Sequence, residues 1–427
     1  MSDYPLMFRV RQTFERPTVV DVAAETEREL ASLDLSGKIK QGQTVAITGG
    51  SRGIANIAKI LKAIVDHVKQ LGGTPFIVPA MGSHGGGTAE GQIGVLASYG
   101  ITEQYCGCEI RASMETIIVC QAAEGFPVHF DKHASEADHV IVCGRVKPHT
   151  NFVGDIESGL MKMMLIGLGK HNGAKIYHRA IMDYNFGQIV RSVGREVLAK
   201  CSIVAGVGIV ENGYDETAKI KAVAPEEFEE REKELLVLAK KWMPRLPFKT
   251  ADFLIIDEMG KNISGSGMDT NVIGRKYLCH EAKEDEYPKI EQIFVRSLTE
   301  ETHGNAAGVG LAEWCTRRLV EQMDARITRI NCLTGGGPTG AIVPLDYESD
   351  REVLDAAMPT LGLVEPPDAE VMWITNTLEV AELECSIAYL EEAKTRTDLE
   401  ILTDPRPLEF DEQGNLATVK ELGLATA

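Results

Sequence analysis

Residues 141–178 have the sequence IVCGRVKPHTNFVGDIESGLMKMMLIGLGKHNGAKIYH, and the rest of the chain is organised around them. The apolar run Val140–Cys143, bounded by a glycine, predicts a buried strand. Charged and imidazole side chains then gather in a segment interrupted by glycines, a composition typical of ligand-handling loops. His149, Lys162 and His178 lie thirteen and sixteen residues apart, too far for one helical face. Each therefore needs its own element to reach a common point.

Length and charge limit the classes of protein to which the chain can belong. With 427 residues, 44% of them hydrophobic, it is long enough for two or three domains with full cores. The net charge of -19 argues against a nucleic-acid partner, because phosphates are bound through basic surface. A small anionic substrate remains compatible with this charge, since a few cations inside a cleft set the local potential.

Targeting and cysteine patterns indicate the compartment. No apolar run approaches the roughly 20 residues of a membrane span, and the first residues lack the apolar core of a signal peptide. We therefore expect a cytoplasmic protein with no membrane partner. The nine cysteines are scattered, which fits reduced thiols, and the close pair Cys106 and Cys108 has no second pair to complete a zinc site. The sequence leaves the oligomeric state open, a homo-oligomer included.

Strand-like and helix-like patterns alternate along the chain, which predicts an α/β fold with mainly parallel sheets. The strands expected in the first half are Thr44–Thr48, Pro75–Val78, His139–Cys143 and Ser202–Val210. The last of three expected helices begins with proline and has acidic residues in its first turn. These helices are Ile54–Leu71, Thr88–Tyr99 and Pro225–Trp242.

A linker with two prolines, Met243–Thr250, separates this series from a second one. In the second series we expect strands at Phe253–Asp257, Ile327–Leu333 and Val371–Thr375, and helices at Gly308–Met323 and Glu379–Lys394. The expected architecture is two α/β domains with an active-site cleft between them. The first domain would comprise residues 1–245 and the second residues 251–378. Residues 379–427 would form a helix and tail with the option of packing back on the first domain.

Three glycine-rich loops follow predicted strands of the first domain. Because loops that leave the carboxyl ends of parallel strands share one edge of the sheet, Arg52, His84 and His149 are expected to converge there. Glycines beside them allow close approach of a ligand, and the helices that follow offer N-terminal amide groups to an anion. A phosphate or carboxylate is therefore the expected ligand. Solvated glycine-rich turns without a ligand are the alternative.

The first of these loops, in the run VAITGGSRGIA at residues 45–55, is similar to the nucleotide-binding turn of short-chain dehydrogenases. Ala55 stands where the last glycine of that motif is expected, and the chain has no Tyr-x-x-x-Lys pair. Both departures count against a dinucleotide site.

The full set of residues resembles another family, the nickel-dependent lactate racemases, across the first half of the chain. The resemblance consists of an arginine after a strand, a Gly-Ser-His turn, a Pro-His pair, a Gly-x-x-Lys motif and a histidine sixteen residues beyond that lysine. In this chain they are Arg52, His84, His149, Gly159–Lys162 and His178.

The resemblance implies a cofactor and a role for each residue. The cofactor is a nickel-pincer nucleotide, a Ni(II) pyridinium-3,5-bisthiocarboxylic acid mononucleotide, attached through a thioamide to Lys162. His178 would supply the remaining nickel ligand, a role that suits imidazole. His84 and His149 would exchange protons with the substrate. Arg52 would hold the substrate carboxylate or the cofactor phosphate. The nucleotide is expected along the turns at Gly50, Ser51, Gly82 and Gly159.

Departures from the family pattern affect the expected substrate. Gly49 replaces an acidic residue and Gly85 replaces an arginine. Two residues are inserted between Gly154 and Lys162, and Asp155 and Glu157 replace small or aromatic residues. A larger or more polar 2-hydroxy acid than lactate is therefore expected.

The second domain supplies further candidates for substrate contact. The family's basic substrate anchor corresponds to Arg275 or Lys276. A glycine-containing loop at residues 302–305 adds His303 and Asn305, for which a purely loop-capping role is the alternative.

These features predict a racemase or epimerase of a small anionic 2-hydroxy acid that works by reversible hydride transfer, with two histidines as acid and base. One alternative is a nucleotide-dependent oxidoreductase that uses the same loops. The other is a non-catalytic protein of the same fold that binds the cofactor or an anion.

Overall fold

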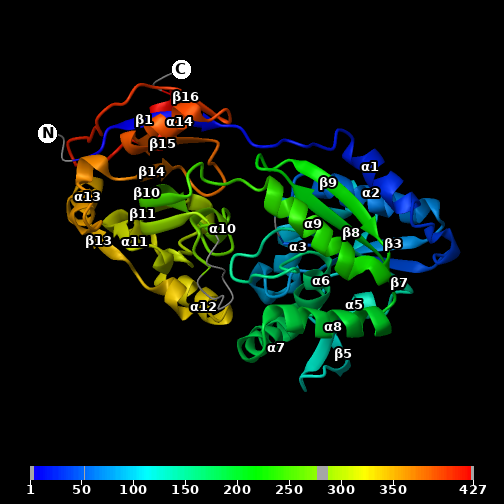
Figure 1. Ribbon diagram of the computed structural model, residues 1–427. Coiled ribbons are helices and arrows are strands. Elements are labelled where there is room, and N and C mark those ends of the chain that lie inside the picture. The colour runs from blue at the N-terminus through cyan, green and yellow to red at the C-terminus, as the bar shows by residue number, and fades with distance from the viewer. Residues whose placement is uncertain (1–3, 52, 277–286, 425–427) are drawn as a thin grey trace. The chain divides into compact units, whose positions relative to one another are not determined.

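The computed structural model describes residues 4–51, 53–276 and 287–424, which form two compact units (Figure 1). The N-terminal unit comprises Glu15–His149 and Val153–Met243. The C-terminal unit comprises the residues before Glu15, the short segment Thr150–Phe152 and the chain from Pro244 onward. The change of unit at Met243 falls within the predicted linker. The assignment of the first residues to the C-terminal unit was not anticipated.

The N-terminal unit is built on a six-stranded sheet in the order β4-β3-β2-β7-β8-β9. All neighbouring pairs are parallel except β8 and β9. This agrees with the predicted α/β class. The strands are β2 (Thr44–Gly49), β3 (Thr74–Pro79), β4 (Glu109–Ile110), β7 (His139–Arg145), β8 (Ile203–Glu211) and β9 (Thr217–Val223). A separate hairpin consists of β5 (Thr116–Gln121) and β6 (Pro127–Asp131).

Helices pack on both faces of this sheet because its central strands are apolar on both sides. The apolar stripe of α2 and the N-terminal helix α1 share one core with the strands. On β8, Gly206 and Gly208 lack side chains, and this allows Phe228 and Leu235 of α9 to approach the backbone closely. The helices are α1 (Val22–Ala31), α2 (Ile57–Gln70), α3 (Ala89–Ser98), α4 (Glu103–Cys106), α5 (Lys132–Ser135), α6 (Leu160–Lys162), α7 (Lys170–Asp183), α8 (Phe186–Lys200) and α9 (Phe228–Trp242).

The strand order places a topological switch point between β2 and β7. From β2 the chain proceeds to β3 and β4 on one side, and it returns through β7 and β8 on the other. In open parallel sheets, ligands bind outside the carboxyl ends of the strands at such a point. The loops after β2 and β7 contain Ser51 and His149, and the neighbouring loop after β3 contains His84.

The C-terminal unit has an eight-stranded sheet in the order β13-β12-β11-β10-β14-β15-β1-β16. The first five are parallel, and β15, β1 and β16 continue the sheet in antiparallel fashion. The strands are β1 (Met7–Gln12), β10 (Thr250–Met259), β11 (Lys289–Leu298), β12 (Trp314–Thr316), β13 (Leu345–Tyr347), β14 (Val371–Ile374), β15 (Glu382–Ser386) and β16 (Leu399–Ile401). The helices are α10 (Thr270–Ile273), α11 (Arg317–Gln322), α12 (Ala325–Thr334), α13 (Asp350–Ala357), α14 (Leu390–Thr395) and α15 (Val419–Leu424).

Three predicted elements of this unit differ from the structure. The expected strand Ile327–Leu333 is helical within α12, because Asp324 caps the first turn through the N–H groups of Arg326 and Ile327. The expected helix Gly308–Met323 contains β12 and is α-helical only from Arg317.

The segment 379–427 also differs from its expected form. Instead of one helix from Glu379 to Lys394, it contributes β15 and β16 to the C-terminal sheet, on both sides of β1. Backbone pairing with β1 holds the segment in the C-terminal unit, whereas the sequence analysis allowed it to return to the first domain. None of the helices in the described ranges is long and apolar enough to cross a membrane.

A buried ion-pair network holds the C-terminal segment to this sheet. Arg296 pairs with Asp257 and Asp350, and all three side chains are at most 4% exposed. Asp257 accepts the N–H of Val419 at 2.7 Å and Asp350 accepts that of Leu416 at 2.9 Å. Each carboxylate therefore has both a charged partner and a backbone donor.

Replacing Arg296 with methionine should lower the free energy of unfolding by about 3–5 kcal/mol, because buried Asp257 loses its cation and buried Asp350 keeps only Arg318. Denaturant unfolding followed by tryptophan fluorescence measures this, with Arg317→Met as the matched control. Arg317 pairs with Asp346 at a side-chain exposure of 45%, so its loss should cost under about 1 kcal/mol. Equal losses in the two variants would contradict the assignment.

Candidate functional site

The turns after β2 and β3 bring two predicted site residues into contact. The hydroxyl of Ser51 is hydrogen-bonded to Nδ1 of His84. Tyr99 supports the same turn by donating its hydroxyl hydrogen to the carbonyl of Ser51 at 3.1 Å. Arg52, the third predicted residue of this edge, lies outside the described residues. The side chain of His84 is exposed, as a group that exchanges protons with a ligand must be.

The loop that follows Ser51 is fastened by an ion pair. Glu211, at the end of β8, accepts the N–H of Ala55 at 2.6 Å. Arg145, at the end of β7, pairs with Glu211 and donates to the carbonyl of Gly53 at 3.2 Å. The charge of Arg145 is therefore balanced by Glu211, and the residue acts on the loop backbone.

Buried side chains that the sequence analysis did not single out hold the turn that contains His84. Gln92 donates to the carbonyls of Gly82 and His84 at 3.0 and 3.3 Å. The ammonium of Lys170 lies 3.4 Å from the amide oxygen of Gln92 and 2.9 Å from Asp131. Lys170 and Asp131 are both fully buried. A buried ion pair therefore sets the position of the turn.

His149 lies in a loop held by another buried carboxylate. Glu157, whose side chain is 0% exposed, accepts the N–H of His149 at 2.8 Å and that of Gly154 at 3.2 Å. Lys240 of α9 supplies its counter-charge. The ring of His149 stacks on Phe186 with the ring centres 6.1 Å apart. Backbone and ring of this histidine are thus both constrained.

Lys162 ends the short helix α6 and is followed by a π-helical turn, η3 (Met163–Gly167). The site turns pack on this segment. A Cβ added at Gly50 would lie 3.3 Å from Met163, and one at Gly82 would lie 3.0 Å from Ile166. The glycines expected to line a nucleotide therefore have a packing role, because they bring the turns after β2 and β3 close to the residues next to Lys162.

His178 lies on α7, which packs on the His84 turn through the face that contains His171 and Ala174. A Cβ at Gly82 would be 3.8 Å from Ala174, and one at Gly87 would be 3.9 Å from Nδ1 of His171. His178 is one turn beyond Ala174, and the i, i+4 spacing puts it on the same face. The loops and helices that carry His84, Lys162 and His178 are therefore in mutual contact.

The candidates in the C-terminal unit are not brought together within their own sheet. Arg275 donates to the carbonyls of Ile290 and Glu291, near the start of β11, and it pairs with Glu313. His303 follows the opposite end of β11, roughly 20 Å further along the strand. The guanidinium of Arg275 thus holds the fold of this unit.

The loop at residues 302–305 has a conformational role of its own. His303 is exposed and adopts a left-handed conformation with φ 49°. Asn305 accepts the N–H of Ala307 through its side chain at 3.1 Å and bonds to Thr302 through its backbone. Asn305 is therefore a loop-capping residue, which leaves His303 as the side chain of this pair that faces solvent.

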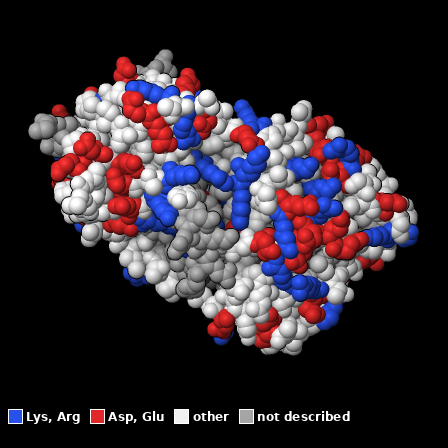
Figure 2. Space-filling view, viewed as in Figure 1, with Lys and Arg blue, Asp and Glu red and all other residues white. Residues whose placement is uncertain are grey.

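The residues that sequence reasoning missed are polar groups at buried positions of helices. Glu232 lies in the apolar stripe of α9, four residues after Phe228 and three before Leu235, and it is fully buried. Its neighbours Glu229, Glu230 and Lys233 form surface ion pairs, and acidic and basic side chains are interspersed over the face that carries α9 (Figure 2). A charge in register with the apolar stripe is the signal that distinguishes Glu232 from the surface charges.

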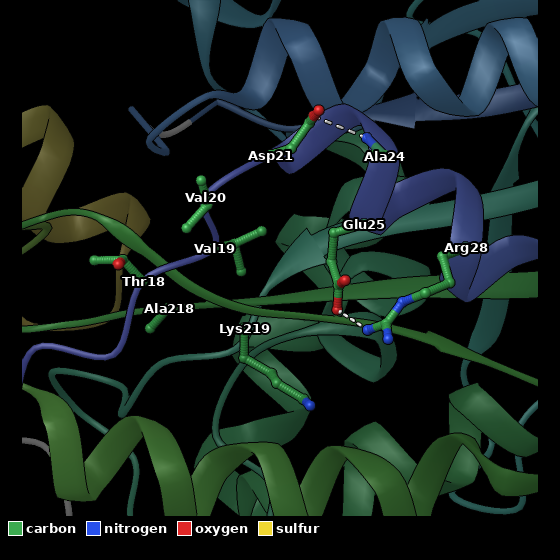
Figure 3. Close-up of a pocket in the computed structure, with 9 residues that line it drawn as sticks. All are labelled: Thr18, Val19, Val20, Asp21, Ala24, Glu25, Arg28, Ala218 and Lys219. Carbon is green, nitrogen blue, oxygen red and sulfur yellow. Dashed lines mark hydrogen bonds and ion pairs between the residues drawn. The ribbon is translucent and has the colours of Figure 1, made fainter.

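The structure also has a surface cavity of about 520 Å³ between α1 and β9 (Figure 3). Glu25 and Arg28, which both belong to α1, pair with each other on one side of it. None of the predicted site residues lines this cavity, so it is separate from the edge of the sheet described above. In the described part of the chain, no three His, Cys, Asp or Glu side chains are grouped as metal ligands.

Comparisons with known proteins relate the chain to one family. Residues 15–187 match the family model described as the lactate racemase N-terminal domain. The lactate racemase apoprotein from Thermoanaerobacterium thermosaccharolyticum has a similar fold, with a TM-score of 0.52 at 12% identity, over 85% of this chain and 93% of that one. A protein from Thermotoga maritima gives a TM-score of 0.48 at 10% identity, over 66% of this chain and 72% of that one. Comparison with curated protein sequences gives no match.

The environment of Glu232 leads to a prediction about pH. Burial raises the pKa of this carboxyl group to about 8, against the opposing effect of hydrogen bonds from the backbone of Met161 and Leu160. The unfolded chain loses this proton near pH 4.5, so between the two pKa values the folded state holds a proton that the unfolded state has released. This contribution to stability is complete below about pH 4.5 and is lost as the pH rises to 8.

The Glu232→Gln variant should lack this contribution, because an amide does not titrate. Its free energy of unfolding should fall less steeply than that of the original chain between pH 5 and 8, by up to about 1.4 kcal/mol per pH unit. Urea unfolding at a series of pH values measures the difference. Parallel curves for the two proteins would contradict a raised pKa at this position.

Proposed function

Residues 15–187 belong to the lactate racemase N-terminal domain family, as the sequence predicted, and on this basis we propose that the chain is an isomerase that inverts a 2-hydroxy acid. The observation that supports the proposal most directly is the contact between Ser51 and His84 at the carboxyl edge of β2 and β3. The same turns pack on the segment that carries Lys162. A proton-exchanging group and an attachable amine therefore lie on elements that are in contact.

The family's cofactor, a nickel-pincer nucleotide, fits the residues present in this unit. Lys162 offers a primary amine on a firmly packed helical segment, and His178 offers an imidazole on the helix beside the same turns. The pincer supplies its own sulfur and carbon donors, so one protein imidazole is sufficient for nickel. When bound, the cofactor would supply a reversible hydride acceptor for the α-carbon of the substrate.

His84 and His149 are the residues we assign to proton transfer at the substrate hydroxyl. Inversion needs a base for each enantiomer, and imidazole exchanges protons readily near neutral pH. Nδ1 of His84 is engaged by Ser51, so Nε2 is the nitrogen we assign to the substrate. His149 is presented from the other side of the switch point, with its backbone on Glu157 and its ring on Phe186.

Recognition of the substrate carboxylate is assigned to Arg52 on the resemblance to the family. Arg145, at the end of β7, is balanced by Glu211. Gly49 ends β2 where the family has an acidic residue. This difference supports a 2-hydroxy acid other than lactate as the substrate.

Attachment of the cofactor is tested by producing the protein together with the cofactor-synthesis enzymes. Intact-mass analysis should show an adduct that is lost in Lys162→Ala, because the amine is its point of attachment. Metal analysis should show nickel that is lost in His178→Ala, because imidazole is the protein's nickel donor. Lys175→Ala is the control, since Lys175 is exposed on α7. Binding of NAD(H) with no adduct would instead identify a nucleotide-dependent oxidoreductase.

Catalysis is tested by exchange of the α-hydrogen in heavy water across a panel of 2-hydroxy and sugar acids. His84→Asn and His149→Asn should each reduce exchange at least about 100-fold while the adduct remains, because each removes one proton-transfer group. His133→Asn, on α5, serves as the control. Adduct and nickel without exchange of any acid would support a non-catalytic binding protein. Full turnover in either active-site variant would remove that histidine from the mechanism.

A further inference from the structure

The start of α6 lacks a cap from its own sequence. The first N–H groups of a helix have no intrahelical partners and are usually satisfied by the side chain that precedes the helix. The residue at that position is Gly159, which has no side chain. Leu160 and Met161 are at most 1% exposed, so water does not replace the missing acceptor.

Glu232 supplies the acceptor from another helix. Its Oε2 accepts the N–H of Met161 at 2.9 Å. Glu232 lies on α9, 71 residues further along the chain, and is 0% exposed. The cap of α6 is therefore a long-range contact.

Gly159, the residue before α6, leaves room for the carboxyl group of Glu232. Its φ of 95° is a conformation that side chains rarely adopt. A Cβ there would lie 2.8 Å from Cδ of Glu232 and 2.9 Å from its Oε2. The glycine thus gives the carboxyl group access to the N–H group of Met161, which a local cap would otherwise have satisfied.

The capped turn carries Lys162 as its last residue. Met163 donates its N–H to the carbonyl of Gly159 at 2.9 Å, which closes the turn around Lys162. Residues beyond the turn pack on the site loops, as described for Met163 and Ile166. Glu232 therefore acts at one end of the segment and the site loops act at the other.

We propose that Glu232 is a positioning residue, which holds Lys162 toward the cofactor site by capping the N–H group of Met161. This inference rests on the proposed function for the purpose of Lys162, but the cap itself is a property of the protein alone. Glu232 touches neither substrate nor cofactor in this scheme and acts through the backbone of α6.

Two substitutions of similar volume distinguish a capping role of Glu232 from a role in packing alone. Glu232→Gln keeps an oxygen that accepts hydrogen bonds, whereas Glu232→Met fills the same space without an acceptor. If Glu232 only filled space, methionine would be the better replacement in this apolar setting. If it caps α6, glutamine should preserve the site and methionine should not. Glu230→Ala, at an exposed position of α9, is the control.

The first measurement uses the protein without cofactor. Amide hydrogen exchange of the peptide that contains Leu160 and Met161 should be about tenfold faster in Glu232→Met than in the original chain, because the acceptor of a buried N–H group is lost. Glu232→Gln and Glu230→Ala should exchange at the original rate. Pulse acetylation should show Lys162 more reactive in Glu232→Met, relative to Lys175. Original exchange rates in Glu232→Met, or equal acceleration in both Glu232 variants, would overturn the proposal.

The second measurement uses protein produced with the cofactor-synthesis enzymes. The adduct fraction should fall in Glu232→Met and be retained in Glu232→Gln. An original adduct fraction in Glu232→Met would overturn the positioning role. If the original chain itself carries no adduct, the proposed function fails, and the exchange and acetylation results still decide whether Glu232 positions Lys162.

Discussion

The candidate site depends on carboxyl groups that accept hydrogen bonds from the backbone of loops and helix starts far away in the sequence. Glu211 holds Ala55, Glu157 holds His149 and Glu232 holds Met161. Each of these groups is buried or nearly so, where such bonds are stronger than in water and where an unmet N–H is costly. Two of the three carry a cation as well, Arg145 on Glu211 and Lys240 on Glu157. Glu232 has no such cation within its described contacts, which is consistent with its raised pKa.

The glycine-rich loops of the site are also held in place by close packing. Gly50, Gly82 and Gly159 each lie so close to a neighbouring side chain that a Cβ would displace it. The absence of a side chain is therefore a requirement of packing between the turns and the helical segment 160–167. A preorganised site of this kind needs little rearrangement when a ligand arrives, which favours both binding and catalysis.

The parallel sheet and the turns at its carboxyl edge could be predicted because they depend on local patterns. Short apolar runs followed by glycine identify β2, β3 and β7, and strand direction then places Ser51 and His84 at one edge. The long-range hydrogen bonds from buried carboxyl groups could not be predicted in the same way. Glu232, for example, belongs to a helix whose surface is rich in acidic residues. Ile327–Leu333 was expected to be a strand, whereas the cap from Asp324 favours a helix. Arg275 matched a substrate anchor by position, but its partners are carbonyls of its own unit.

The place of β1 in the C-terminal sheet has a consequence for synthesis of the protein. Met7–Gln12 pairs with β15 and β16, which lie beyond residue 380. At ribosomal rates of about 5–20 residues per second, roughly 20 to 75 seconds pass between the emergence of the first strand and that of its partners. During that interval the N-terminal unit can fold, whereas the segment with apolar Met7, Phe8 and Val10 has no partner strands with which to pair. The nascent chain thus exposes a short apolar segment, to which chaperones can bind, before the rest of the C-terminal sheet has been synthesised.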